Sequence, residues 1–346
     1  MANYIDSDIR RSIDDAVEEF FEPPIALQQL VFKQTKTFET TKIDLDLRKG
    51  VERTVGYVRR IEQGNYVEKT GFETREIEPP YLKPKKILRP EDFRKRIPGE
   101  ILYAQGKERS GAVQKLVAHE LMDLDNIIVR NHAVAQAELL VTGKVTAFDD
   151  EGVAIKEIDF GRDNTLTRTT SNLWSDQTNG DPLGDFETDR QTIADLSDQT
   201  ADFVILGSEL VPLFLKHPNV RQSISKDWAA RGEITRKMRK LGLVWLGEID
   251  ELDIYTLKRS YLALGAGGSL TRTPYIPAKK YVIGSSEAEA GMYYGAIEHV
   301  SNPRTVPRWF DTYNQDDPSG EVIQLHSAGM PVTRHVNAYA TTTAKG

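Results

Sequence analysis

The longest regular pattern of apolar residues lies in residues 112–142, a stretch without glycine or proline. A helix of this length would be roughly 45 Å long, and Gly143 is suited to end it. Apolar residues recur at helical spacing, namely at Val113, Leu116, Val117, Leu121, Leu124, Ile127, Ile128 and Val134. The pattern predicts a long helix across a domain. The side chains expected to be buried against neighbouring strands are Leu116, Leu121, Leu124 and Ile128.

Residues 43–98 carry strand-like alternation without a core of their own. Alternation begins earlier, over residues 27–47, and places Asp44 and Asp46 on one strand face, opposite Ile43 and Leu45. We interpret the two aspartates as a solvated face and not as a metal pair. Residues 50–78 then read as a two-stranded ribbon that turns at Gly64-Asn65. Such a ribbon is marginal alone in water, so we expect this arm to be ordered against another molecule.

Two charged segments flank this arm. Residues 1–22 hold seven acids and two arginines, a net charge of −5, and could be either a frayed terminus or a docking arm. Residues 83–96 hold seven basic and two acidic residues. Nucleic-acid binding is disfavoured for the basic segment because it lacks interleaved aromatic residues on which bases could stack. We therefore expect it to pair with an acidic segment of a neighbouring chain.

The remainder of the chain has the pattern of an α+β unit. Strands are predicted at 144–148 and 153–160 around an acidic turn, and a short buried strand at 203–206. Helices are predicted at 210–215, 220–224 and 233–241, and strand-like runs at 253–264 and 275–283. Residues Gly265 to Gly268 are interpreted as a hairpin tip. The last strands are expected at 322–326 and 333–339.

Composition narrows the possible functions. The 346 residues carry a net charge of −7 and contain no cysteine. The acidic balance disfavours a dedicated DNA-binding module, and the missing thiols exclude disulfides, thiolate metal sites and cysteine nucleophiles. The acidic first residues do not resemble a signal peptide, and no apolar stretch approaches membrane-spanning length. We therefore expect a soluble protein made in the cytosol.

Candidate chemistry is weak. His119-Glu120 begins like a zinc motif, but Asp123 stands where the second histidine would be needed. Gly265 to Gly268 lacks the lysine and hydroxyl residue of a phosphate-binding loop, and Ser208 is expected to cap the following helix instead of acting as a nucleophile. The six histidines share no metal-ligand spacing. The sequence predicts no catalytic residue, no metal site and no cofactor.

Three segments together resemble one family, the phage lambda-type major head proteins. Tyr81-Leu82-Lys83-Pro84-Lys85-Lys86 is similar to the stretch that follows the family's extended loop. Residues 140–146, continuing through Asp159-Phe160-Gly161-Arg162 to Trp174, resemble the end of its long helix, its β-hairpin and its Asp-x-Gly-Arg turn. Residues 322–328 with Pro331 and the following strand resemble its closing strand. The order of elements matches along nearly the whole chain, and residues 185–310 match least well.

The resemblance implies the α+β major capsid fold of tailed bacteriophages and herpesviruses. Its parts would be an N-terminal arm (1–47), an extended loop (48–80), a peripheral domain with a spine helix (81–165, helix 112–142), an axial domain (166–320) and a C-terminal strand returning to the peripheral domain (321–346). The implied function is a major capsid protein that forms pentamers and hexamers of an icosahedral phage head around double-stranded DNA. It would be assembled in the bacterial host cytoplasm and located in the virion.

The implied partners are other copies of the chain, a scaffold, a portal, possible decoration proteins, and DNA bound without sequence specificity; no membrane is involved. A cargo-enclosing bacterial nanocompartment shell is the alternative within this fold, and a soluble hydrolase with a long insertion is the alternative outside it. The residues expected at contacts between subunits are charged or aromatic, namely Asp14, Asp15, Glu18, Glu19, Arg53, Arg59, Arg60, Tyr66, Phe72, Lys83, Lys85 and Lys86.

Overall fold

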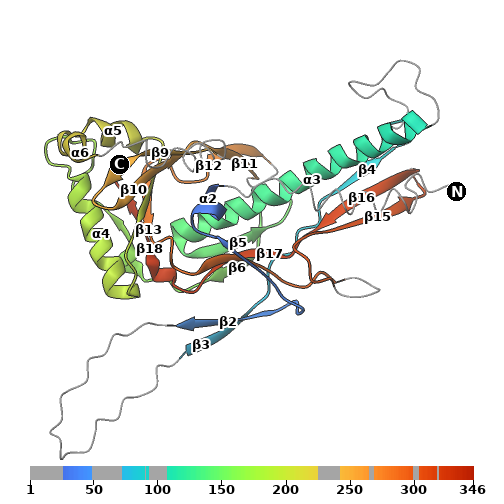
Figure 1. Cartoon of the computed structure of the whole chain (residues 1–346), viewed down its shortest axis with the longest axis horizontal. Helices are drawn as coiled ribbons and strands as arrows, with labels where there is room; N and C mark the ends of the chain where they lie inside the picture. The colour runs from blue at the N-terminus through green and yellow to red at the C-terminus, as the bar shows by residue number, and fades with distance from the viewer. Residues whose placement is uncertain are drawn as a thin grey trace, which may run out of the picture.

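The computed structural model describes residues 26–48, 72–89, 91–92, 107–224, 242–264, 269–298, 304–317 and 319–346. Figure 1 shows an elongated molecule with a helix-flanked sheet at one end. Helix α3 (Lys107–Thr142) runs from there to the other end. Strands β2 (Ile43–Arg48) and β3 (Phe72–Ile77) pair with each other and extend away from the body.

The sheet at the first end has six strands in the order β7-β18-β13-β8-β10-β9. Their bounds are β7 (Thr167–Thr169), β8 (Phe203–Leu206), β9 (Leu243–Ile249), β10 (Leu252–Leu257), β13 (Lys280–Gly284) and β18 (Tyr339–Thr343). Alternate residues of β8 join different hydrophobic clusters: Phe203 and Ile205 the central one, Val204 and Leu206 the one that includes helix residues. Both sheet faces are therefore buried, which explains the uninterrupted apolar run.

Helices α4 (Pro182–Ser197), α5 (Leu210–Lys216) and α6 (Pro218–Ser223) contribute to that second cluster, which includes Trp174 and Phe186. Two three-stranded sheets lie outside the six-stranded one. The first has the order β1-β14-β17, with β1 (Gln34–Thr37), β14 (Ala290–Tyr294) and β17 (Gly329–Thr333). The second has the order β15-β16-β4, with β15 (Trp309–Gln315), β16 (Gly320–His326) and β4 (Lys85–Leu88).

Two further hairpins are β5 (Lys144–Phe148) with β6 (Ala154–Asp159), and β11 (Ser260–Leu264) with β12 (Leu270–Pro274). Short 3₁₀ turns cover Asn164–Leu166 and Val336–Ala338. The predicted end of the long helix is confirmed: Gly143 has φ +73° and donates its N–H to Leu139 O at 2.8 Å. Helix α3 begins earlier than expected, at Lys107, because a single Gly111 is tolerated inside a helical pattern.

Several sequence expectations were wrong. Residues Ala26–Leu30 form helix α2 and not a strand, because Leu27, Leu30 and Val31 have helical spacing and are all buried in the central cluster. The range 333–339 is not one strand. Strand β17 ends at Thr333 in one sheet, and β18 starts at Tyr339 in another. Ser208 does not cap α5, whose N-cap residue is Glu209 without a side-chain hydrogen bond.

Strand pairing also crosses two of the expected domain boundaries. Residues 309–315, expected in the axial domain, form β15 and pair with β16. Strand β18, expected to return to the peripheral domain, lies between β7 and β13 in the six-stranded sheet. The closing segment therefore serves both ends of the molecule: β16 lies beside α3, and β18 completes the helix-flanked sheet. The expected domain boundaries stay predictions.

Candidate assembly interface

The peripheral end of the molecule is a sheet fixed on helix α3. Val117, Leu121, Leu124 and Ile128 from the helix pack with Leu88, Phe310, Ile323 and Leu325 from strands β4, β15 and β16. Burial of Leu121, Leu124 and Ile128 confirms the predicted apolar face of the helix. Leu116 is only half-buried, so that part of the expectation was wrong. The cluster holds β4 against the helix and decides which β4 side chains face inward.

Strand β4 divides its two basic residues between opposite faces, as alternation requires. Lys86 points to α3, where its Nζ donates to the carboxylates of Glu120 and, at 2.9 Å, Asp123. Burial opposes the charged form, but these two carboxylates outweigh it and raise the pKa of Lys86. Lys86 is thus paired within its own subunit, and its expected contact with a neighbour stays a prediction. Asp123, which stands where a zinc motif would need its second histidine, is one of the two partners of Lys86.

Lys83 and Lys85 lie on the other face of this segment and are exposed, together with Arg89. Ile87, between them on the same face, is 40% exposed although it is a large apolar residue. Among the described strands, β16 is the only neighbour of β4, which therefore lies at an edge of its sheet. The exposed side chains on the outer face of β4 are therefore basic and partly apolar, as expected of a contact surface.

The tyrosine that opens this motif has a structural role. Tyr81 OH lies 2.6 Å from His326 Nδ1, and its ring meets the imidazole edge-on at 5.9 Å between centroids. Trp309 packs on the other side of His326 at 5.0 Å, and the Arg304 guanidinium lies 6.0 Å from the Trp309 ring centre. These contacts fasten the start of β4 to β15 and β16. Nothing in the sequence spacing indicated this pairing of residues 245 positions apart.

The base of the expected extended loop is a regular antiparallel ladder, from Ile43 opposite Ile77 to Arg48 opposite Phe72. Ile43, Leu45 and Ile77 are buried in the central cluster, and Asp44 is exposed, which confirms the predicted alternation. The segment 48–80 therefore contributes to the subunit core, because Ile77, near its C-terminal end, is buried in the central cluster. Arg53, Arg59, Arg60 and Tyr66 lie outside the described residues, as do Asp14, Asp15, Glu18 and Glu19 of the arm.

Ion pairs line a groove between the loop base and β6. Lys42 Nζ lies 3.1 Å from Glu76 Oε2, and Lys156 Nζ lies 2.9 Å from Glu78 Oε2. The hydrogen bond and charge of Lys156 lower the pKa of Glu78. Ile77 and Ile158 contribute apolar lining, and the groove encloses about 480 Å³. The lining is fully paired and mixed in charge, so the groove serves as a joint between loop and body.

The β5–β6 hairpin and the turn after it are built on the end of α3. Asp159 Oδ1 accepts from Gly161 N at 2.8 Å, and Gly161 has φ +75°. The turn directs Arg162 back to the helix, where its guanidinium donates to Leu140 O at 2.8 Å and Val141 O at 2.6 Å. Burial lowers the pKa of Arg162 to about 10. The Asp-x-Gly-Arg turn is thus a cap for carbonyls at the end of α3.

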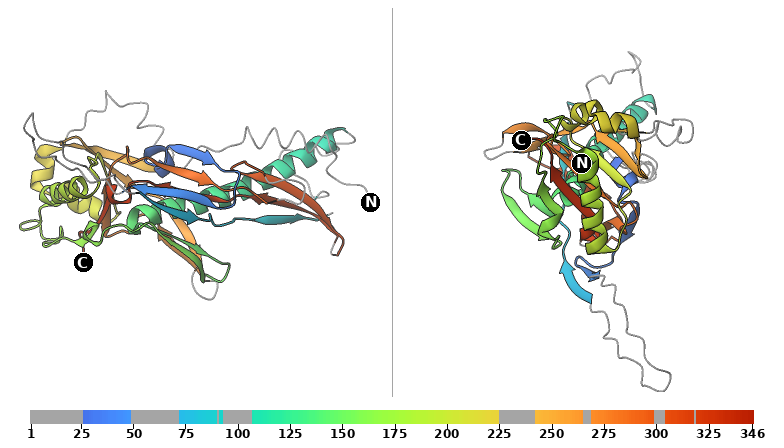
Figure 2. Two further views of the ribbon diagram at one scale, coloured as in Figure 1. Left: turned by 90° about the horizontal axis from the view of Figure 1, so that it is seen from below. Right: turned by 90° about the vertical axis from the view of Figure 1, so that its left-hand side faces the viewer.

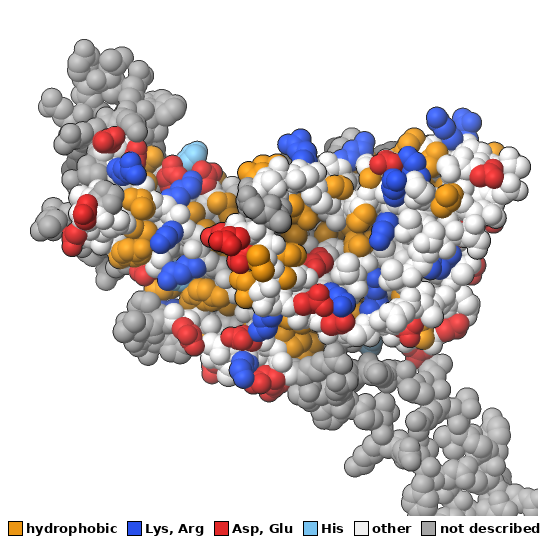
Figure 3. Space-filling view, turned by 180° about the vertical axis from the view of Figure 1, so that it is seen from behind, with side chains coloured by type: hydrophobic (Ala, Val, Ile, Leu, Met, Phe, Trp, Pro, Cys, Tyr) orange, Lys and Arg blue, Asp and Glu red, His pale blue; other side chains and the backbone are white. Residues whose placement is uncertain are grey.

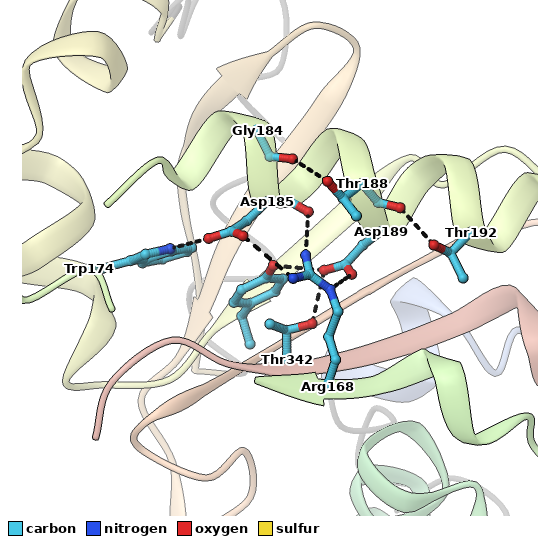
Figure 4. A network of polar contacts seen from close by, with 9 residues as sticks. Arg168, Trp174, Gly184, Asp185, Thr188, Asp189, Thr192 and Thr342 are labelled. Atoms are coloured by element: carbon cyan, nitrogen blue, oxygen red, sulfur yellow. Dashed lines mark hydrogen bonds and ion pairs between the residues drawn. The ribbon is translucent and has the colours of Figure 1, made fainter. Parts of the chain in front are cut away.

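A buried polar network joins α4 to the six-stranded sheet (Figure 4). Arg168 Nε donates to Asp189 Oδ1 at 2.5 Å, and Tyr281 OH donates to Asp189 Oδ2 at 2.7 Å. Trp174 Nε1 donates to Asp185 Oδ2 at 2.8 Å. Burial raises the pKa of Asp185, and burial with the nearby Asp189 raises that of Tyr281. The groups satisfy one another's hydrogen bonds, so we interpret the network as structural.

The described residues include no group of three or more His, Cys, Asp or Glu side chains placed to hold a metal ion. His119 lies exposed on α3. Among the helices that the structure describes, none is both long enough and apolar enough to cross a membrane. Among the described residues, the surface features left as candidates for a functional site are exposed strands and hairpins.

Comparison with known proteins agrees with this geometry. The chain is 26% identical to the major capsid protein of Enterobacteria phage P21 over 88% of its length and 89% of the relative's. It is 22% identical to the major capsid protein of Escherichia phage lambda over 90% and 92%. A crystal structure of a protein assigned as a prophage capsid protein of Escherichia coli CFT073 superposes with a TM-score of 0.72, at 18% identity and 99% coverage of both chains.

A family model described as phage major capsid protein E matches residues 10–344, nearly the whole chain. The phage relatives support the capsid over the nanocompartment alternative. The expected fold is confirmed as the tailed-bacteriophage capsid fold. A structural role in a phage head accounts for the large apolar side chains that this subunit exposes on strands and hairpins. This chain belongs to the phage major capsid protein E family and is a subunit of a phage capsid.

Proposed function

We propose that the chain builds its shell as pentamers and hexamers and that the shell encloses double-stranded DNA. The single observation that carries the proposal is the match of the family model to residues 10–344. The elongated subunit supports it, because β4 lies at the edge of its described sheet and the β2–β3 ribbon projects, and such elements need partners. We propose no catalysis, and assembly in the host cytoplasm with the virion as the final location.

Contacts between copies are proposed at the loop and at the outer face of β4. No third strand pairs with the β2–β3 ribbon in the part of the chain that the structure describes, and a two-stranded ribbon this thin needs further support. Residues Arg53, Arg59, Arg60, Tyr66 and Phe72 would contact the neighbour over which the loop lies. Lys83 and Lys85 remain contact candidates because they are exposed, and the acidic arm residues Asp14, Asp15, Glu18 and Glu19 remain candidates on the opposite side.

The accessory partners follow from the same role. A scaffold, a portal and decoration proteins would act before or after shell closure. The net charge of −7 disfavours tight binding of the protein to phosphates. DNA would therefore be held by confinement and without sequence specificity.

Size-exclusion chromatography with electron microscopy of the purified chain tests the proposal. We expect capsomers or closed shells with fivefold and sixfold clusters, of megadalton mass. A small monodisperse species at all concentrations and salt conditions would contradict it, and turnover of a substrate by that species would favour the enzyme alternative.

A further inference from the structure

The tip of the β5–β6 hairpin exposes large apolar side chains. Phe148 and Val153 are each 58% exposed, and Ile155 is 69% exposed. The strand register shifts between Ala147 and Phe148, so that Ile155 has no Cα partner on β5. Irregularities of this kind turn a side chain away from the regular sheet face. Three neighbouring apolar groups on one small hairpin are unusual for a surface without a partner.

The turn between these strands is acidic and well ordered by its own hydrogen bonds. Asp149 Oδ1 accepts from Glu151 N at 2.9 Å and from Val153 N at 2.8 Å. Gly152 takes the positive φ of +78° that closes the turn. Asp150 and Glu151 are exposed. The tip thus presents apolar groups and two outward acids on a rigid base.

The hairpin projects from the body of the subunit. Both views in Figure 2 show the green β5–β6 hairpin extending to one side, and the left view shows β4 along the other half of the molecule. Figure 3 looks onto the face from which the hairpin projects, and it shows hydrophobic side chains beside acidic ones near the centre of that face. A contact between the hairpin tip and β4 therefore requires a second copy.

We propose that the β5–β6 tip of one subunit docks on the outer face of β4 in a neighbouring copy. The inference rests on the proposed function, because only assembly brings the two surfaces together. Charge complementarity carries it: Asp150 and Glu151 oppose the exposed Lys83, Lys85 and Arg89. The apolar groups also correspond, since Ile87 and Tyr313 are 40% and 43% exposed. On this sheet both are paired with Val322, so they share one face.

Such a contact joins two different surfaces, and repeated copies of a contact of this kind form rings and shells. The acidic turn also disfavours DNA as the partner, because phosphates would be repelled. Exposed ion pairs contribute little singly, so the buried apolar groups would supply most of the affinity and the charges would set the orientation.

A charge exchange tests the contact in the full-length chain. One variant carries D150K and E151K, a second carries K83E and K85E, and a third combines all four changes and restores the wild-type net charge. Each variant is assembled at low salt, shells are counted by electron microscopy, and far-ultraviolet circular dichroism checks the fold. We expect each two-residue reversal to raise the subunit concentration needed for assembly at least roughly tenfold, and the combination to return it to within about threefold of wild type.

A fourth variant, V153S with I155S, should lose assembly without changing the circular dichroism. Normal assembly of either charge-reversed variant would overturn the inference. Failure of the combination to restore assembly would also overturn it, and would direct attention to another acidic partner for β4, such as residues 1–22. The wild-type protein, assembled in the same series, distinguishes failure of this contact from failure of the proposed function. If the wild-type protein forms no shells, the proposed function fails as well.

Discussion

Leu124 shows how a single side chain supports the peripheral end of the molecule. It is 1% exposed and lies between α3 and the β15–β16–β4 sheet. Leu124→Ala should lower the free energy of unfolding by about 2–5 kcal/mol, the usual cost of emptying a buried leucine site. Ile127 lies three residues after Leu124 on α3 and is 37% exposed. It is the matched control, and Ile127→Ala should cost less. Urea denaturation of unassembled subunits measures both, and a Leu124→Ala loss under about 0.5 kcal/mol would contradict the packing.

Lys85 and Lys86 form a natural pair of tests, because adjacent residues of one strand face opposite sides. Lys86→Met breaks contacts with Glu120 and Asp123 that are partly exposed, so it should destabilise the subunit by about 1 kcal/mol or less. Lys85→Met should leave subunit stability unchanged and reduce assembly instead. The two readouts are urea denaturation and shell yield. If Lys85→Met lowered stability and Lys86→Met reduced assembly instead, the two faces of β4 would be oriented the other way round.

Asp185 gives the subunit a pH dependence whose sign can be stated. Burial raises its folded-state pKa above the unfolded value, against the opposing effects of Trp174 and Arg168. Its contribution to stability is therefore full below the unfolded pKa and is lost as pH rises through the folded pKa. Asp185→Asn keeps an acceptor for Trp174 and removes this loss. Urea denaturation between pH 4 and 7 should show the stability of the variant gaining on wild type as pH rises, and a constant difference would refute the assignment.

The end of α3 depends on one side chain from the following turn. Arg162→Met leaves Leu140 O and Val141 O without their charged donor, which should cost about 1.5–3 kcal/mol. Lys144→Met is the control, because its ion pairs with Glu157 and Asp159 are exposed and should contribute little. Thermal unfolding of the two variants should differ clearly, and equal melting temperatures would remove Arg162 as the helix cap.

Elements with strong local patterns could be predicted from sequence, whereas partners distant in the chain could not. The body of α3, the β5–β6 hairpin and the buried β8 follow from spacing, glycine and apolar runs. Helix α2 was mistaken for a strand because its few apolar residues fit both the helical and the strand period. The division between β17 and β18 depends on two different sheets. The partners of Lys86 within the subunit lie on α3, and no local signal in the sequence reveals them.

The same limit applies to the candidate interface. The exposure of Lys83 and Lys85 follows from strand alternation, but the apolar hairpin tip was not singled out. Phe148, Val153 and Ile155 looked like ordinary strand residues in the sequence. Only the fold shows that this hairpin projects with its apolar groups uncovered.

Considered as a whole, the molecule has a body that should fold without the distal part of the loop. Arg48 and Phe72 are paired across the ladder, so residues 49–71 can be replaced by an Asn-Gly turn while Ile77 stays in the core. The shortened chain should remain soluble with unchanged helical circular dichroism and form no shells. Replacement of the full segment 48–80 should also destabilise the subunit. Normal shells from the shortened chain would show that the loop is dispensable for assembly.

A cryo-electron microscopy reconstruction of the wild-type assembly tests the central claim most directly. We predict a closed icosahedral shell in which residues 49–71 of each subunit lie over an adjacent copy. A shell in which that segment packs on its own subunit, or a preparation that contains only small monodisperse particles, would contradict the account.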